Sequence, residues 1–383
     1  MTRSCAVIHV FLGLIVSLSA SLSAVAAIPI PTAPAVDARA YILVDFRTDK
    51  SLAAKNATER MEPASLTKLM TAYIVFQELA AGKLKLDEPI MVSEKAWRSE
   101  GSRTFIELGK PVPVQALILG MIVQSGNDAT IALAERVAGT EETFVQLMNF
   151  NAARLGMVGT HFENSSGLPS GQHFTTARDM SLLASAMIRD FPQYYKWYSV
   201  REFEYNGIKQ QNRNGLLERD PSVDGLKTGH TDSAGYCLVT SALRDGMRLV
   251  SVVLGSASMK ERENASAALI NYGFTFYDTQ LVVHAAAKQA TAVVWKGQNS
   301  SVDVGAQRDL YLTLPRGQAG DIKTSVDLNP RLIAPLGTET RIGDLHVRVA
   351  GHEVTTVPLH PLRAVAAGGW WRHLIDTVRL WFA

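Results

Sequence analysis

Ser65 and Lys68 lie three residues apart in Pro63-Ala64-Ser65-Leu66-Thr67-Lys68, a segment predicted to begin a helix. Pro63 suits a first helical position, and apolar residues follow at helical spacing. Side chains three residues apart share one helix face, so the hydroxyl and the amine can meet. A lysine whose pKa is lowered can take the proton of a serine and make it a nucleophile. The pair is not specific by itself, because Ser and Lys occur at this spacing on many solvated helices.

A second motif, Ser125-Gly126-Asn127, stands between predicted helices at 114–124 and 128–138. Ser125 can relay a proton to a leaving amine. Asn127 can donate a hydrogen bond to the amide side chain of the substrate and can hold Lys68 in place. Both roles belong to acyl transfer, in which the leaving amine must be protonated.

A third motif, Lys227-Thr228-Gly229, is expected on a strand edge. Lys227 would add positive charge toward a carboxylate, and Gly229 would let a substrate backbone come close. The backbone N–H of Ser65, with one N–H from the strand after Lys227, could form an oxyanion hole. The three motifs together predict acyl transfer through a serine nucleophile.

Strands near both ends of residues 40–274, with helices between them, must position these motifs. Apolar patterning predicts strands at 40–46, 51–57, 236–242 and 248–255, and helices that include 142–155, 176–189 and 260–274. This order predicts an α+β fold in which helices pack on one antiparallel sheet. Residues 163–173 form a polar loop. His173 and the nearby Asp179 could affect deacylation, but loop polarity alone accounts for both.

The composition changes near Leu281. From there to about Leu362, short Val- and Thr-rich runs are separated by Gly and Pro, which predicts a small all-β domain. The tail from 369 to 383 places its large apolar residues on one helical face, and it is too short and polar to span a bilayer. Its tryptophans and arginines suit a membrane interface. A helix docked on the β domain is the alternative.

The first residues predict a cleaved secretory signal at 1–26. Arg3 precedes an apolar run at 7–18, and Ala24-Val25-Ala26 is a small-residue cleavage pattern. A retained membrane span is the alternative. We therefore expect domains at 27–281 and 282–363 and an anchor helix at 366–383.

Composition and cysteine content limit the remaining possibilities. The 383 residues carry 38 basic and 36 acidic side chains, which gives no general electrostatic basis for nucleic-acid binding. Removal of the signal takes away Cys5 and leaves Cys237, so no internal disulfide can form. We expect Cys237 to pack as a small buried hydrophobic residue. No ligand spacing for a metal, and no Gly-rich phosphate loop, is evident, so we expect neither metal nor cofactor.

The order of the three motifs resembles that of penicillin-binding proteins and serine β-lactamases. The chain is similar to the low-molecular-mass penicillin-binding proteins that act as D-alanyl-D-alanine carboxypeptidases, a peptidase S11-like family. The resemblance runs from Tyr41 to about Phe274, includes residues 163–180 and 223–236, and extends to the β domain and the tail. It implies a serine β-lactamase/penicillin-binding-protein-like peptidase domain, a small all-β domain and a C-terminal amphipathic helix.

The resemblance also implies substrate-binding residues beyond the Lys-Thr-Gly motif. His230 follows that strand, as is usual in this family. Arg262 falls where the family carries an arginine that holds the terminal carboxylate of the substrate. Arg213, in Asn212-Arg213-Asn214-Gly215, is a further candidate near the cleft. The alternatives are a surface histidine at a strand end and a solvated helix arginine.

By resemblance, the substrate is a peptidoglycan stem peptide that ends in D-Ala-D-Ala, and β-lactams are covalent inhibitors. The protein would be exported, and its helix would hold it at the periplasmic face of the inner membrane. Three alternatives remain: a D,D-endopeptidase, a β-lactamase, and a silent wall-associated scaffold. A class A β-lactamase would carry Glu-x-x-Leu-Asn where this chain has Glu163-Asn164-Ser165-Ser166-Gly167. A scaffold is disfavoured because Ser65 and Lys68 are both present.

Overall fold

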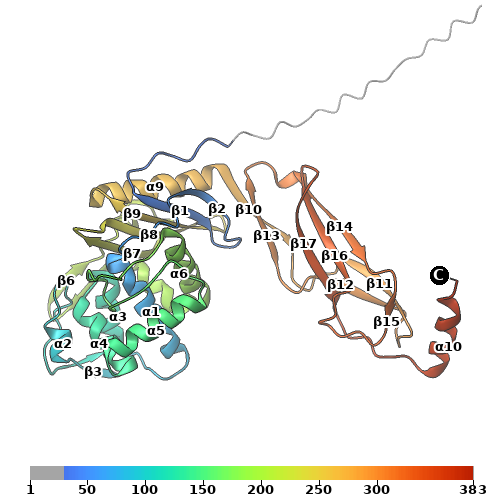
Figure 1. Cartoon of the computed structure of the whole chain (residues 1–383), viewed down its shortest axis with the longest axis horizontal. Coiled ribbons are helices and arrows are strands. Elements are labelled where there is room, and N and C mark those ends of the chain that lie inside the picture. Colours follow the sequence, from blue (N-terminus) through green and yellow to red (C-terminus); the bar gives the residue numbers. More distant parts are fainter. Residues whose placement is uncertain (1–29, 383) are drawn as a thin grey trace, which may run out of the picture.

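The computed structural model describes residues 30–382, so the predicted signal at 1–26 lies outside the described residues. Figure 1 shows a domain of helices and sheet, a β domain joined to it, and a terminal helix at the far end of the β domain. Within 30–382, no helix combines the length and the apolar character needed to cross a membrane.

The first domain is built on a five-stranded antiparallel sheet with the strand order β2-β1-β9-β8-β7. Its strands are β1 (Ala40–Asp45), β2 (Ser51–Lys55), β7 (Val223–Thr231), β8 (Gly235–Arg244) and β9 (Met247–Ser256). The motif Lys227-Thr228-Gly229, expected on a strand edge, lies within β7, and the strand extends over the whole of 223–231. Because β7 lies at one end of the order, it presents an open edge.

Alternating residues of the central strands face two different cores. Ile42 and Val252 pack with the helical block, whereas Leu43 and Val253 pack with the long helix α9 (Met259–Phe276). This alternation follows from the two-residue period of a strand. The sheet is therefore covered on both faces, with α9 on one side and the helical block on the other (Figure 1).

Helix α1 (Lys68–Ala80) lies at the centre of the helical block and is buried along almost its whole length. Around it lie α3 (Val114–Leu119), the π-helical turn η2 (Gly120–Gln124), α4 (Asn127–Ala138), α5 (Glu141–Arg154) and α6 (Ala177–Asp190). Side-chain oxygens of Thr140 and Thr176 accept backbone N–H groups in the first turns of α5 and α6. Such caps fix where the helices begin.

Short elements complete this domain. They are α2 (Glu94–Trp97), the β3–β4 pair (Pro89–Met91 and Pro111–Pro113), α7 (Pro192–Tyr195), η3 (Lys196–Ser199), the β5–β6 hairpin (Glu202–Tyr205 and Ile208–Gln211) and α8 (Leu216–Arg219).

The second domain is all β, apart from one short 3₁₀ turn, η4 (Ala319–Asp321). Strand β10 (Tyr277–Val283) pairs with β13 (Leu310–Pro315), and the predicted boundary after residue 281 falls inside β10. A six-stranded sheet follows in the order β14-β16-β17-β12-β11-β15. Its strands are β11 (Ala290–Trp295), β12 (Ser301–Gly305), β14 (Ile322–Leu328), β15 (Leu332–Ile333), β16 (Gly343–Val349) and β17 (His352–Pro361).

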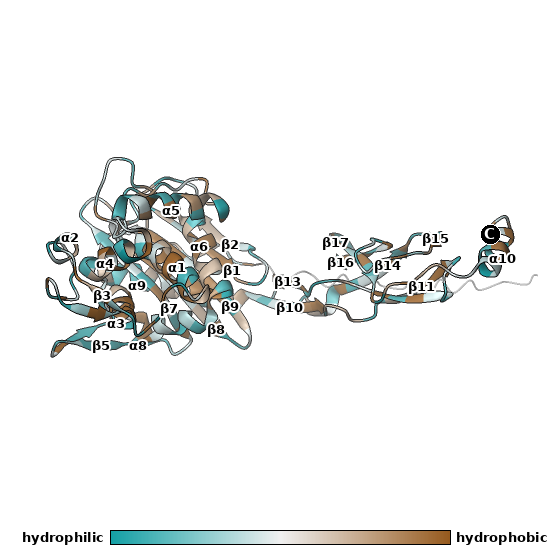
Figure 2. Ribbon diagram, turned by 90° about the horizontal axis from the view of Figure 1, so that it is seen from below, coloured by the Kyte–Doolittle hydropathy of each residue, from teal (hydrophilic) through white to brown (hydrophobic). Residues whose placement is uncertain are grey.

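The terminal helix α10 (Trp370–Arg379) touches the β domain through its polar side. The buried carboxylate of Asp376 accepts the backbone N–H of Lys296 at 2.7 Å and pairs with Arg372 at 3.1 Å. The large apolar residues near this end of the chain remain exposed; they are Trp370, Trp371, Leu374, Ile375, Val378, Trp381 and Phe382. Figure 2 shows this helix at the end of the molecule away from the first domain.

Candidate active site

Ser65 lies in a 3₁₀ turn, η1 (Ala64–Thr67), and Lys68 is the first residue of α1. The sequence predicted one continuous helix here, but the tighter turn still brings the two side chains together. Lys68 Nζ lies 3.0 Å from Ser65 Oγ, 2.7 Å from Asn127 Oδ1 and 2.6 Å from the carbonyl oxygen of Ser166. The contacts with Asn127 and Ser166 hold the amine within hydrogen-bonding distance of the Ser65 hydroxyl.

Burial lowers the pKa of the Lys68 amine. The side chain is 1% exposed, and the loss of solvation lowers its pKa to about 7, with a further lowering by the charge of Arg213. The carboxylate of Asp128 acts in the opposite direction but does not restore the ordinary value. A neutral lysine amine within hydrogen-bonding distance of a serine hydroxyl can accept its proton.

Ser125 and Asn127 reach the same centre from the turn that joins η2 to α4. Ser125 adopts a left-handed backbone conformation (φ 65°), and its buried Oγ has no hydrogen-bond partner among the described residues. Asn127 holds Lys68 through Oδ1, but its Nδ2 donates to the carbonyl oxygen of Glu100 at 2.6 Å. The expected donation from Asn127 to a substrate therefore competes with a contact inside the protein.

Asp128 was not singled out from the sequence, although it follows Asn127 directly. Its buried carboxylate accepts the backbone N–H groups of Thr104, Phe105 and Ile106 at 2.8, 2.8 and 3.2 Å. These contacts hold the segment that carries Ser102, which lines the cleft. Three N–H donors on one carboxylate fix the backbone conformation of this segment. The amino-acid composition of the segment gives no sign of these contacts.

Strand β7 forms the opposite wall of the cleft. Lys227 is buried, and desolvation together with the charges of Lys68, Arg213 and Arg262 holds its pKa well below the ordinary value. Gly229 lines the cleft as predicted, but the structure gives it a further reason: a Cβ there would lie 3.1 Å from the carbonyl oxygen of Pro63. A glycine lets β7 pack directly against the turn that carries the serine.

Positive charge gathers at one end of the cleft. Arg262, 4% exposed, donates to the carbonyl oxygens of Gly229 at 3.1 Å and Arg213 at 3.4 Å, and its guanidinium lies over the Tyr236 ring. His230 is exposed and its ring lies against that of Tyr236, with centroids 4.0 Å apart. Arg262 is thus not the solvated helix arginine of the alternative interpretation.

The cleft brings together most of the residues that the sequence predicted. It is lined by Ser65, Ser102, Ser125, Arg213, Thr228, Gly229, His230, Tyr236, Met259 and Arg262. Lys68 and Asn127 do not line the cleft, but Lys68 contacts both Ser65 and Asn127. Lys227 is on the same strand as Thr228, and its amine donates to the Thr228 carbonyl oxygen at 3.0 Å.

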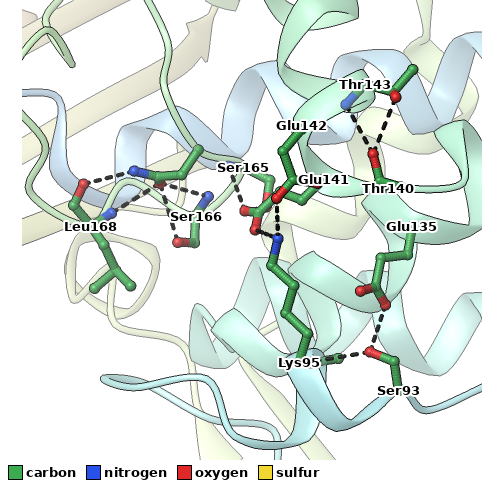
Figure 3. Close-up of polar contacts among 12 residues, drawn as sticks. Ser93, Lys95, Glu135, Thr140, Glu141, Glu142, Thr143, Ser165, Ser166 and Leu168 are labelled. Carbon is green, nitrogen blue, oxygen red and sulfur yellow. Dashed lines mark hydrogen bonds and ion pairs between the residues drawn. The ribbon is translucent and has the colours of Figure 1, made fainter.

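The loop at 163–173 supports the site from behind. Asn164 Oδ1 accepts three successive backbone N–H groups, from Ser166, Gly167 and Leu168. Glu141 accepts both the backbone N–H and the hydroxyl of Ser165. Figure 3 shows how Lys95 in turn pairs with Glu141 and Glu142. This scaffold holds the Ser166 carbonyl that contacts Lys68.

His173 closes the same loop, and the explanation by loop polarity was wrong for it. The ring is 3% exposed, and burial lowers its pKa to about 4. Nε2 lies 2.8 Å from Thr67 Oγ1, and Nδ1 accepts the N–H of Glu163 at 3.0 Å. Asp179, also buried, accepts the N–H of Gly159 and the hydroxyl of Thr160 and is not among the residues lining the cleft.

Comparisons with known proteins identify the family of each domain. The D-alanyl-D-alanine carboxypeptidase family model matches residues 28–258, and that of the penicillin-binding protein 5 C-terminal domain matches 277–367. The D-alanyl-D-alanine carboxypeptidase DacA of Escherichia coli is 41% identical over 361 residues, 92% of this chain and 90% of the relative.

Solved structures give the same assignment. Penicillin-binding protein 5 from Haemophilus influenzae superimposes with a TM-score of 0.84 at 38% identity, over 88% of this chain and 99% of that one. Penicillin-binding protein D2 from Listeria monocytogenes, solved in an ampicillin-bound form, gives 0.59 at 31% identity over 64% of this chain and all of its own. The chain belongs to the D-alanyl-D-alanine carboxypeptidases, a family of serine-type penicillin-binding hydrolases.

Proposed function

We propose that this protein removes the terminal D-alanine of peptidoglycan stem pentapeptides through an ester formed on Ser65. The observation that carries the proposal is the 3.0 Å contact between Ser65 Oγ and the buried amine of Lys68, whose pKa is lowered to about 7. Lys68 takes the hydroxyl proton as Ser65 attacks the carbonyl carbon. D-Alanine then leaves, and water hydrolyses the ester.

Ser125 is the candidate to pass a proton to the departing amine, because its buried hydroxyl lines the cleft and has no partner among the described residues. Asn127 keeps the Lys68 amine in place from the other side. The backbone N–H of Ser65, with one from β7, would stabilise the negative charge that develops on the carbonyl oxygen.

The substrate would bind along the open edge of β7, beside Thr228 and Gly229, as an added strand. Its terminal carboxylate would lie toward Arg262, Arg213 and Lys227, where positive charge gathers. His230, exposed at the mouth of the cleft, is a further contact. β-Lactams would enter the same cleft and stop at the ester stage. The ampicillin-bound form of the Listeria relative supports β-lactam binding.

We also place the exported protein at the periplasmic face of the inner membrane. The support is the cluster of exposed apolar side chains on and after α10, in which Trp381 is 81% and Phe382 is 89% exposed. Monomeric proteins rarely leave so large a patch in water, and paired tryptophans with nearby arginines suit the lipid interface.

The decisive experiment incubates the protein without residues 1–26 with diacetyl-Lys-D-Ala-D-Ala and measures free D-alanine, with and without penicillin. Penicillin-sensitive release is expected, and Ser65→Ala should abolish both release and covalent penicillin labelling. Labelling of Ser65→Ala would remove Ser65 from its role. Rapid penicillin turnover without D-alanine release would identify a β-lactamase instead.

A further inference from the structure

The residue before the nucleophile has an unusual backbone. Ala64 has φ 46°, in the left-handed region that residues with a Cβ rarely occupy. Such a conformation persists only when its surroundings hold it. Two contacts hold the carbonyl group of Ala64. Thr67 Oγ1 donates to its oxygen at 2.8 Å, and Gly167 lies so near that a Cβ there would overlap it.

Thr67 is itself held by the buried His173. Because the N–H of Glu163 donates to Nδ1, the neutral imidazole carries its proton on Nε2. Nε2–H therefore donates to Thr67 Oγ1 at 2.8 Å, which leaves the Thr67 proton for the Ala64 carbonyl oxygen. The result is a single-direction chain of hydrogen bonds from the loop at 163–173 to the peptide group before Ser65.

That peptide group also contains the N–H of Ser65. In a planar trans peptide, the C=O and N–H bonds point in opposite directions. Holding the Ala64 oxygen on the Thr67 side thus fixes the Ser65 N–H toward the other side. Hydrogen bonds in a chain polarise one another, so donation to the oxygen also makes the N–H of the same peptide a stronger donor.

We propose that Thr67 and His173 are positioning residues that orient and polarise the oxyanion-binding N–H of Ser65. Neither residue lines the cleft, and neither side chain is a hydrogen-bond partner of the Lys68 amine. They act through the Ala64–Ser65 peptide group. The step that they affect is stabilisation of the oxyanion, which acylation and deacylation share. This inference rests on the proposed function, because it assigns a source of control to the same Ser65 ester.

The test compares Thr67→Val, which removes the hydroxyl while keeping the shape, with Thr67→Ser, which keeps the hydroxyl. Each protein is acylated with a β-lactam labelled with ¹³C at its reactive carbonyl, and the ester band is read by isotope-edited infrared difference spectroscopy. A weaker oxyanion hole polarises the ester less. Thr67→Val should therefore move the band to higher wavenumber and slow acylation about tenfold, while Thr67→Ser should resemble the wild type.

His173→Ala provides a second, independent measurement. It should shift the band in the same direction, and in the Thr67→Val background it should add nothing, because the chain is already broken. Thr160→Val is the matched control: it removes a threonine hydroxyl that donates to Asp179, outside the chain. Penicillin titration of active sites corrects every rate for the folded fraction.

The outcomes separate the two proposals. If the wild-type protein forms no ester, the proposed function fails. If it forms the ester and Thr67→Val leaves the band unmoved, the function stands and the positioning role is refuted, even when the variant is slower. Equal band shifts in Thr67→Val and Thr160→Val would also refute it, since a general loss of packing would then explain both.

Discussion

The two domains differ in the number and the roles of their buried charged side chains. The first domain buries several charged side chains in or near its cleft and its supporting loops: Lys68, Asp128, Glu141, Asp179, Lys227 and Arg262. Among residues 277–382, Asp376 is the one charged side chain that is buried, and it fastens α10 to the β11–β12 turn. Burial of an ion is unfavourable unless partners compensate for it, so each case needs a reason.

In the first domain, the proposed reason for the burial of Lys68 and Lys227 is reactivity. Burial and neighbouring cations lower the pKa of both lysines, which would make an amine base available near neutral pH. In the β domain, the reason is attachment, because Asp376 satisfies a backbone N–H and an arginine. The comparison predicts that changes to buried charge affect catalysis in one domain and leave it unchanged in the other.

The largest effect on hydrolysis is expected from Lys68→Met, which removes the base while nearly preserving the buried volume. Acylation by penicillin should fall by about 10²- to 10⁴-fold, the usual contribution of a positioned base. Stopped-flow labelling measures the rate, and thermal unfolding shows whether the protein remains folded. A folded Lys68→Met protein that acylates at the wild-type rate would show that another group is the base.

Arg262→Met should have the next largest effect, through substrate binding. Loss of a charge-assisted contact to the terminal carboxylate should lower kcat/KM about 10- to 100-fold for diacetyl-Lys-D-Ala-D-Ala. The same peptide with an amidated C-terminus is the control, since it lacks that carboxylate. An equal loss on both peptides would assign Arg262 to holding β7 and not to the carboxylate.

A smaller effect is expected from Arg213→Gln, and it should appear as a shift in pH dependence. The amine of Lys68 acts as a base when neutral, so acylation should rise as the pH passes through about 7. The Arg213 charge lowers that pKa, and its removal should therefore raise it and move the profile to higher pH. Rates measured between pH 5 and 9 test the direction, and a shift to lower pH would contradict the assignment.

Deletion of residues 366–383 should have the smallest effect on hydrolysis, namely none. The truncated protein should release D-alanine as before but should no longer sediment with anionic phospholipid vesicles. Trp381→Ser is a milder control, because it removes one of the exposed apolar side chains and leaves α10 in place. A truncated protein that still sediments would place the membrane contact elsewhere.

The order of the three motifs, the alternation of the strands and the change of composition near Leu281 can be recognised in the sequence. These features depend on neighbouring residues or on short periods, and the family and fold inferred from them are confirmed. The domain boundaries and the roles of Ser65, Lys68 and the other site residues stay predictions. Because the predicted site residues lie in or beside one cleft, each role can be tested by substituting a single residue.

The contacts that hold the site join residues far apart in the sequence. Lys68 meets Ser166, Thr67 meets His173, and Asp128 meets the backbone at 104–106, across 98, 106 and 22–24 residues of sequence. No local sequence pattern predicts such contacts. The sequence around a histidine or an aspartate in a polar segment does not show whether its side chain is solvated or buried. Lys68 and His173 are buried where the loop at 163–173 packs against the start of α1, and the loss of solvation lowers the pKa of both.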